Sequence, residues 1–205
     1  MGNSVKMNSS VVSRKGLPES ERRDSFYLNG RFMYDYSIQS VQVSLDSGVS
    51  EYLYAVSDGM DVEIPEEKTS ISIIKELIRL QERLNTSSGD IQYKVGELKE
   101  RVEEANNLIH SMTLNNPDNA ATERGFSGLI VSGNKAVALN IGSSRIYLLR
   151  EGVFKHITVD YTKAERLLRL GIINNEQAET LSNKFGIPTE ENRVKVQLSN
   201  IFNLK

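Results

Sequence analysis

The stretch Gly142-Ser143-Ser144-Arg145 lies between two runs of residues that favour β-strands, Ala136 to Ile141 and Ile146 to Leu149. A turn sequence, Ser132-Gly133-Asn134, precedes the first run, and a second, Glu151-Gly152, follows the second run. Short strands joined by tight turns predict an antiparallel meander in this part of the chain.

Upstream of the meander, the apolar pattern changes from the period of strands to the period of helices. Asn29-Gly30 predicts a hairpin turn, and the alternation from Val41 to Leu45 predicts a half-buried strand. The denser apolar run from Tyr52 to Val56 predicts an interior strand that ends at Ser57-Asp58-Gly59. Two amphipathic helices follow, with apolar residues at Ile73, Leu77, Leu80 and Leu84, and then from Ile91 to Met112.

The two helices allow two arrangements. Their spacing fits an α-hairpin coiled coil, and it equally fits packing on a sheet. Downstream of the meander, Thr162 and Glu165 predict the start of a short helix that Gly171 closes. A second short helix is predicted from Glu176 to Lys184, and a late strand from Val194 to Leu198.

Length and composition indicate one globular domain. The chain has 205 residues, of which 39% are hydrophobic, and this is enough to bury a full core. Residues 1–20 are polar and serine-rich and predict a flexible N-terminal tail, so the domain is expected over residues 21–205. The absence of cysteine excludes disulfides and thiolate metal sites.

Charge and hydropathy narrow the classes of partner. A formal net charge of -2 gives no basis for binding nucleic acid or an anionic membrane. No apolar run reaches the roughly 20 residues that a transmembrane helix needs, and no secretion signal is present, so a cytoplasmic location is expected.

The two histidines, His110 and His156, have no neighbouring ligand cluster and are interpreted as structural or surface residues.

Three stretches resemble the metal-dependent protein phosphatases (PPM, or type-2C serine/threonine phosphatases), especially their bacterial members. They are Tyr54 to Met60, Gly133 to Thr162 and Leu170 to Ala178. The tetrad Gly142-Ser143-Ser144-Arg145 is similar to the family's signature, which has aspartate at the position of Ser143. The resemblance implies an α+β fold, an α-β-β-α sandwich of antiparallel sheets flanked by helix pairs. It also implies a domain that is truncated at the C-terminus, because the family's last strands would follow Lys205.

The resemblance further implies a centre of two Mg²⁺ or Mn²⁺ ions that activate a water toward phosphoserine or phosphothreonine. Such ions prefer oxygen ligands and lower the pKa of bound water. Asp58 matches the family's bridging aspartate, the carbonyl of Gly59 matches the adjacent backbone ligand, and Asp24 resembles a second metal-binding acid. No side chain is predicted to be a catalytic group in its own right. Without the resemblance, Asp58-Gly59 is also explained as an ordinary turn and Asp24 as a surface acid.

Several positions depart from the family's pattern. Arg23 stands where the family has a glutamate, and Glu19 falls near the place of its phosphate-binding arginine. Asp61 and Val62 replace two glycines after Met60. A cation at a metal-ligand position and an anion at a phosphate position both oppose the chemistry electrostatically.

Three functions remain open from the sequence. The first is a phosphatase-like domain that is inactive as given and acts by binding a protein partner or phosphoprotein. The second is a metal-dependent phosphatase whose remaining ligands lie beyond Lys205. The third is a regulatory domain that senses a ligand. An exposed sheet edge or apolar patch is also expected to promote self-association.

Overall fold

The computed structural model describes residues 5–14, 25–32, 39–58, 69–86, 88–114, 125–142, 144–159, 163–182 and 196–204. Within them, a seven-stranded sheet has the order β10-β7-β6-β5-β2-β3, with β11 also paired to β7. Neighbouring strands are antiparallel. Their bounds are β2 (Ser25–Leu28), β3 (Arg31–Phe32), β5 (Glu51–Asp58), β6 (Gly125–Ser132), β7 (Lys135–Ile141), β10 (Gln197–Leu198) and β11 (Phe202–Asn203).

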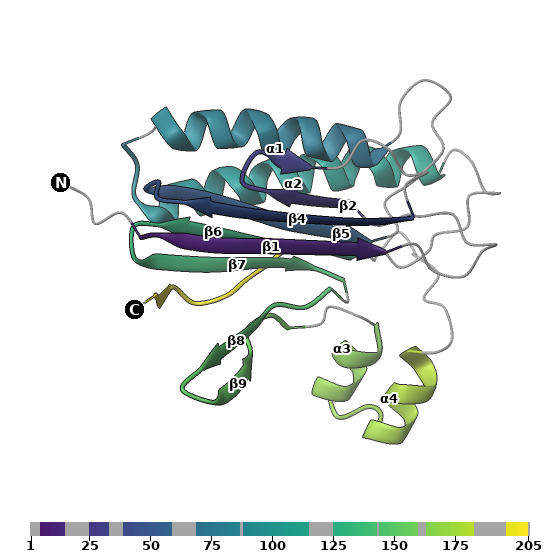
Figure 1. The fold of residues 1–205 in the computed structure, drawn as a ribbon. Coiled ribbons are helices and arrows are strands. Elements are labelled where there is room, and N and C mark those ends of the chain that lie inside the picture. The colour runs from purple at the N-terminus through teal and green to yellow at the C-terminus, as the bar shows by residue number, and fades with distance from the viewer. Residues whose placement is uncertain are drawn as a thin grey trace.

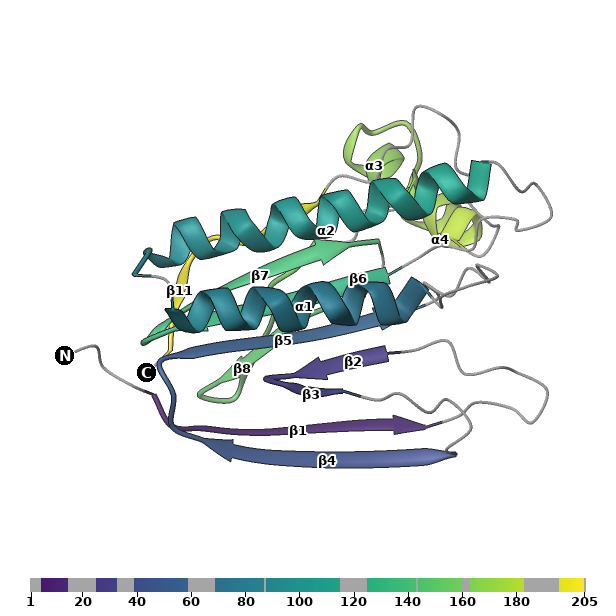
Figure 2. The same ribbon diagram turned by 90° about the horizontal axis from the view of Figure 1, so that it is seen from above.

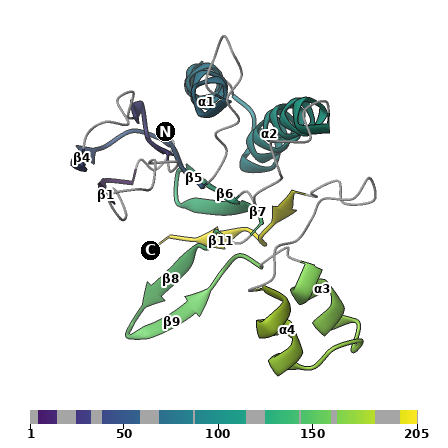
Figure 3. The same ribbon diagram turned by 90° about the vertical axis from the view of Figure 1, so that its right-hand side faces the viewer.

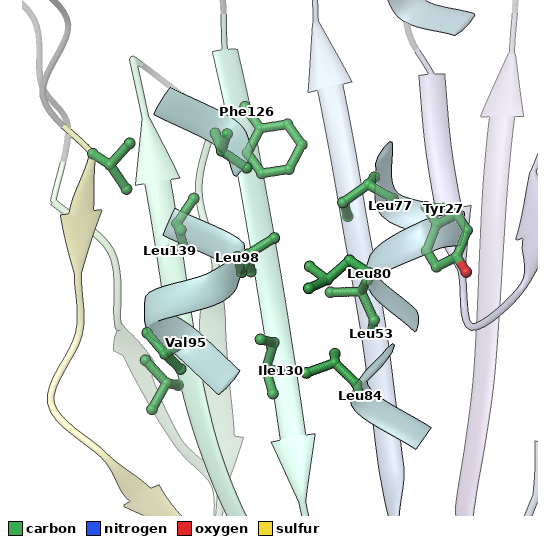
Figure 4. Close-up of a cluster of buried hydrophobic side chains, with 14 of the residues drawn as sticks. Tyr27, Leu53, Leu77, Leu80, Leu84, Val95, Leu98, Phe126, Ile130 and Leu139 are labelled. Atoms are coloured by element: carbon green, nitrogen blue, oxygen red, sulfur yellow. The ribbon is translucent and has the colours of Figure 1, made fainter. Parts of the chain in front are cut away.

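Two helices, α1 (Thr69–Thr86) and α2 (Ile91–Leu114), cover one face of this sheet (Figures 1 and 2). Their apolar stripes contact alternate residues of the strands, because every second side chain of a strand points to the same face. Figure 4 shows this cluster, which includes Leu80, Leu98 and Leu53. The helix pair therefore packs on the sheet, which decides between the two arrangements that its sequence allows.

A two-stranded ladder of β1 (Met7–Arg14) and β4 (Ser40–Ser47) packs on the other face of the sheet, over β2 and β5 (Figure 3). Val11 of β1 and Val43 of β4 pack against Phe26, which points away from the helices. This face therefore has its own, smaller hydrophobic cluster.

The strand β1 corrects the prediction that residues 1–20 form a flexible tail, which is wrong for Met7–Arg14. Its inward positions alternate with exposed ones, as in any half-buried strand, but two of the inward residues are serines. The Ser9 hydroxyl lies 2.7 Å from the Tyr54 hydroxyl, and the Tyr52 hydroxyl donates to the carbonyls of Val5 and Ser47. Polar contacts of this kind are invisible to a hydrophobic pattern.

The predicted antiparallel pairing is correct for β6 with β7 and for the next two strands with each other, but the expected continuous meander is wrong between these two pairs. After β7, Gly142 has a positive φ of 72°, and the chain leaves the sheet. The strands β8 (Tyr147–Arg150) and β9 (Val153–His156) then pair with each other and form a separate ladder (Figures 1 and 3). Strand propensity alone does not determine which strands pair.

The predicted α+β class with antiparallel sheets is confirmed. The second sheet of the expected sandwich differs: in the described part of the chain it consists of two separate ladders, β1–β4 and β8–β9. The short helices α3 (Lys163–Arg169) and α4 (Asn175–Ser182) lie on the side of β8–β9 and contact each other (Figure 1).

The C-terminal end of α3 follows the rule that predicts it, whereas Thr162 of the predicted capping box lies outside the described residues. Gly171 has a φ of 69°, and its amide donates to the Leu168 carbonyl, which closes α3. Asn174 and Gln177 form a reciprocal capping box at the start of α4. No helix in the described ranges is long and apolar enough to cross a membrane.

The phenol of Tyr27 is buried in the cluster between the sheet and the helices. Burial raises the pKa of Tyr27 from 10.0 to about 12; the hydrogen bond with the Gly30 backbone acts in the opposite direction, and the charge of Glu82 adds to the rise. A pKa that is higher in the folded state stabilises the fold below the unfolded pKa, and this contribution disappears as pH rises through the folded pKa.

We therefore expect Tyr27 to make the protein less stable as pH rises from 10.0 to about 12. Urea unfolding measured across this window should show a steeper loss of unfolding free energy for the wild type than for Tyr27→Phe, which has no ionisable group at this position. Equal slopes would show that the Tyr27 phenol is not the titrating group.

Candidate functional site

Four strand ends meet at one edge of the seven-stranded sheet, on the right-hand side of Figure 2. The strands β2 and β6 begin there, and β5 and β7 end there, because neighbouring strands are antiparallel. We call this end of the sheet, where the ends of these four strands meet, the Asp58 edge; the name does not refer to an edge strand. Its outermost paired residues are Ser25 with Ser57, Asp58 with Gly125, and Phe126 with Ile141.

The structure places one of the three predicted metal-binding residues at this edge. Asp58 is the last residue of β5. Asp24 and Gly59 lie outside the described residues. The residue that follows Asp24, Ser25, pairs with the residue that precedes Asp58, Ser57. The sheet register therefore brings Ser25 opposite Ser57, which their separation in the sequence does not show.

The tetrad returns to the same edge. A Cβ atom built on Gly125 would overlap the hydroxyl oxygen of Ser144, so only glycine allows this close approach. Gly125 is the cross-strand partner of Asp58. Ser143 itself lies outside the described residues. Ser144 of the tetrad therefore packs against Gly125, the residue that pairs with Asp58.

Asn140, near the end of β7, is a buried polar residue at the centre of this region. The Ser127 hydroxyl donates to Asn140 Oδ1 at 2.5 Å. Asn140 Nδ2 donates to the carbonyl oxygens of Gly142, at 3.3 Å, and Val159, at 3.2 Å. One side chain therefore joins the sheet to two loops.

The second of these loops, Ile157 to Val159, is also tied to the residue that follows the tetrad. The Ile146 amide donates to Thr158 Oγ1 at 3.0 Å, and the Ile157 amide donates to the Ile146 carbonyl at 2.9 Å. His156 lies 3.1 Å from Thr158 Oγ1 and stacks on the Tyr147 ring, as suits the structural role predicted for it.

Sequence reasoning missed Asn140, Ser127 and Thr158. The sequence signal that could identify Asn140 is its polar side chain, which interrupts the otherwise apolar end of a strand. A buried amide needs hydrogen-bond partners, and those partners come from loops whose positions only the folded chain defines.

A curated relative supports the resemblance to phosphatases. The serine/threonine protein phosphatase PstP of Mycobacterium tuberculosis is 27% identical over 168 residues, which are 82% of this chain and 28% of that protein. The chain thus spans little more than a quarter of the curated relative's length.

Solved structures share the fold along nearly the whole chain. The catalytic domain of PstP, crystallised with two manganese ions, aligns with a TM-score of 0.58 and 22% identity, over 98% of this chain and 73% of that one. The S. agalactiae serine/threonine phosphatase has a TM-score of 0.66 and 15% identity, over 98% of this chain and 76% of that one. This chain has the fold of the metal-dependent serine/threonine phosphatases.

The phosphatase Stp1 from Staphylococcus aureus shares this phosphatase fold too, with a TM-score of 0.61, 17% identity, and coverage of 98% of this chain and 73% of that one. No protein-family model matches the chain. The phosphatase fold is therefore shown by structure, while about a quarter of each solved phosphatase has no counterpart in these 205 residues.

The described donors at the Asp58 edge of the phosphatase fold do not by themselves fit a centre for two divalent ions. Among the residues that the structure describes, no group of three or more histidine, cysteine, aspartate or glutamate side chains lies together. Apart from Asp58, the described polar side chains at this edge are hydroxyls and an amide, and divalent ions of this type require several carboxylates. The Ser57 hydroxyl is buried and has no hydrogen-bond partner within the described ranges.

Proposed function

We propose that this chain is a phosphatase-like domain that acts by binding protein and does not hydrolyse phosphoesters. The observation that carries this proposal is the identity of residue 23, an arginine where the resemblance to the phosphatases places a glutamate. In the sequence, Arg23 directly precedes Asp24, the second candidate metal-binding acid.

A guanidinium in place of a metal-binding carboxylate opposes the binding of divalent cations. By the resemblance to the phosphatases, the same position should hold a carboxylate. The exchange of an anion for a cation removes attraction and adds repulsion at once.

Glu19 and Val62 support the same proposal. Glu19 falls near the place of the family's phosphate-binding arginine, and an anion there repels a phosphate group. Val62 replaces a glycine after Met60, so a close backbone approach at that position would meet a branched side chain. Both residues lie outside the described ranges, and both arguments come from the sequence.

A second candidate function is a metal-dependent phosphatase. It is favoured by Asp58, which ends an interior strand at the edge where the tetrad returns, and by the two manganese ions in the solved PstP catalytic domain. In this case the further ligands would come from outside the described residues, and Mn²⁺ or Mg²⁺ would be the cofactor.

Calorimetric titration with Mn²⁺ and hydrolysis of a phosphothreonine peptide distinguish the two functions. We expect the wild type to show neither saturable Mn²⁺ binding nor Mn²⁺-dependent hydrolysis. We expect Arg23→Glu to gain saturable Mn²⁺ binding, at least about tenfold tighter than the detection limit at which the wild type shows none, because the local charge changes by two units. Arg22→Glu is the matched control, since it changes the net charge equally at a position without the resemblance.

Hydrolysis that rises with Mn²⁺ in the wild type and is lost in Asp58→Asn would overturn the proposal of a protein-binding domain without hydrolysis. It would establish that the chain is a phosphatase. Equal Mn²⁺ affinities of Arg23→Glu and Arg22→Glu would remove Arg23 as the residue that weakens the site.

The partner that the binding proposal implies is a protein. The ladder β8–β9 presents Tyr147, Leu149 and Phe154 as exposed side chains, and aromatic residues are enriched in protein interfaces. Tyr147 and Phe154 stack on each other, with ring centroids 4.6 Å apart. The self-association and the cytoplasmic location predicted from the sequence remain predictions.

A further inference from the structure

We propose that Asn140 is a positioning residue that holds two loops, one that begins at Gly142 and one from Ile157 to Val159, at the Asp58 edge. The inference goes beyond the proposed function, because it concerns how this edge is assembled, with or without a bound metal.

The amide of Asn140 is suited to joining two loops. Its side chain is 1% exposed, so each of its polar atoms needs a partner within the protein. Its two N–H groups reach the carbonyls of Gly142 and Val159, which lie on different loops. Of the residues close to asparagine in size, aspartate has no donor and leucine has no polar atom. Asparagine alone among them supplies two donors and an acceptor.

Ser127 sets the orientation of that amide. It is the cross-strand partner of Asn140, and its hydroxyl donates to Oδ1. With the oxygen occupied in this way, the NH₂ group faces the two loop carbonyls. Ser127 also lies two residues after Gly125, the partner of Asp58. Asn140 and the candidate metal-binding aspartate therefore both pair with strand β6, on its two sides.

The two loops behave as one unit because they are bonded to each other. The amides of Ile146 and Ile157 are used in this link, with Thr158 Oγ1 and the Ile146 carbonyl as acceptors. Ser144 adds a packing contact with Gly125. Asn140 connects this unit to the sheet, so loss of its two donors should loosen both loops together.

Amide hydrogen exchange measured by NMR tests the proposal, with Ile146 and Ile157 as reporters. We expect Asn140→Asp to accelerate exchange at both amides by about tenfold or more, because the two loop carbonyls lose their donor and face a negative charge. Exchange at Ile130 and Val137, in the centre of the sheet, should change much less. Asn134→Asp, at an exposed position in the β6–β7 turn, is the matched control and should leave all four amides unchanged.

A role in packing alone gives a different result. Asn140→Leu keeps the side-chain size but removes the donors, so a pure packing role predicts that Leu preserves the protection of both amides. We expect Leu to act like Asp. Ser127→Ala, which leaves Asn140 in place, should accelerate the same two amides by a smaller factor and provides the test if the Asn140 variants do not fold. Unchanged exchange at Ile146 and Ile157, or an equal rise at Ile130, would overturn the proposal.

Mn²⁺ titration of the same variants separates this inference from the proposed function. If the wild type binds Mn²⁺, the proposal of a protein-binding domain without hydrolysis loses support. The positioning role of Asn140 then predicts weaker Mn²⁺ binding by Asn140→Asp. If the wild type binds none, the exchange rates alone decide whether Asn140 positions the loops.

Discussion

Replacing Leu80 with alanine should lower the free energy of unfolding by about 2–5 kcal/mol. Leu80 lies on α1 and is fully buried in the cluster between the helices and the sheet, beside Leu53 of β5 (Figure 4). Truncation removes apolar contacts and leaves a cavity that the surrounding helix and strands fill only in part. Urea denaturation followed by circular dichroism measures the change.

Leu170→Ala is the matched control for this experiment. Leu170 follows α3 and is 63% exposed, so its truncation should change the unfolding free energy by no more than about 0.5 kcal/mol. A similar loss for both variants would mean that Leu80 does not belong to a packed core.

Replacing Lys94 with methionine should destabilise the protein by about 3–5 kcal/mol. Lys94 of α2 lies 2.7 Å from Glu51 Oε1, and the two side chains are only 5% and 10% exposed. Ser132, the cross-strand partner of Glu51, donates to the same carboxylate at 3.0 Å. Glu51 Oε2 is buried and has no partner within the described ranges, so removal of Lys94 leaves a buried carboxylate without a cation.

The double variant Lys94→Met with Glu51→Leu should recover most of that stability, because replacing a whole buried ion pair by apolar residues is often neutral. Lys6→Met is the matched control, since Lys6 pairs with Asp46 at 3.1 Å on the surface, where such pairs contribute about 0–1 kcal/mol. If the double variant is as unstable as Lys94→Met alone, an unpaired charge is not the cause of the loss.

Local signals predicted most of the elements correctly. The turn Asn29-Gly30 has positive φ values of 44° and 93°, and Glu151-Gly152 has 52° and 79°, as tight hairpin turns require. The interior strand β5 was recognised because it is apolar on both faces. These features depend on residues close together in the chain, so they can be read before the fold is known.

Features that depend on distant contacts were missed or misassigned. The sequence of β1 predicts a tail, because serines occupy two of its inward positions and the contact of Ser9 comes from a distant strand. The sequence predicts a continuous meander that includes β8–β9, although the turn at Gly142 separates this ladder from β7. The buried pair of Lys94 and Glu51 gave no signal at all, since each residue alone is typical of a protein surface.

For the candidate site, the sequence by itself determined which residue types are present: an aspartate at the end of an interior strand, a nearby acid at position 24, and a cation at position 23 that opposes a metal. Only the tertiary structure decided that Ser25 pairs with Ser57, that Ser144 packs on Gly125, and that Asn140 holds two loops at this edge. The physical reason is that strand pairing and buried hydrogen bonds join residues far apart in the chain, and their geometry exists only once the sheet has formed.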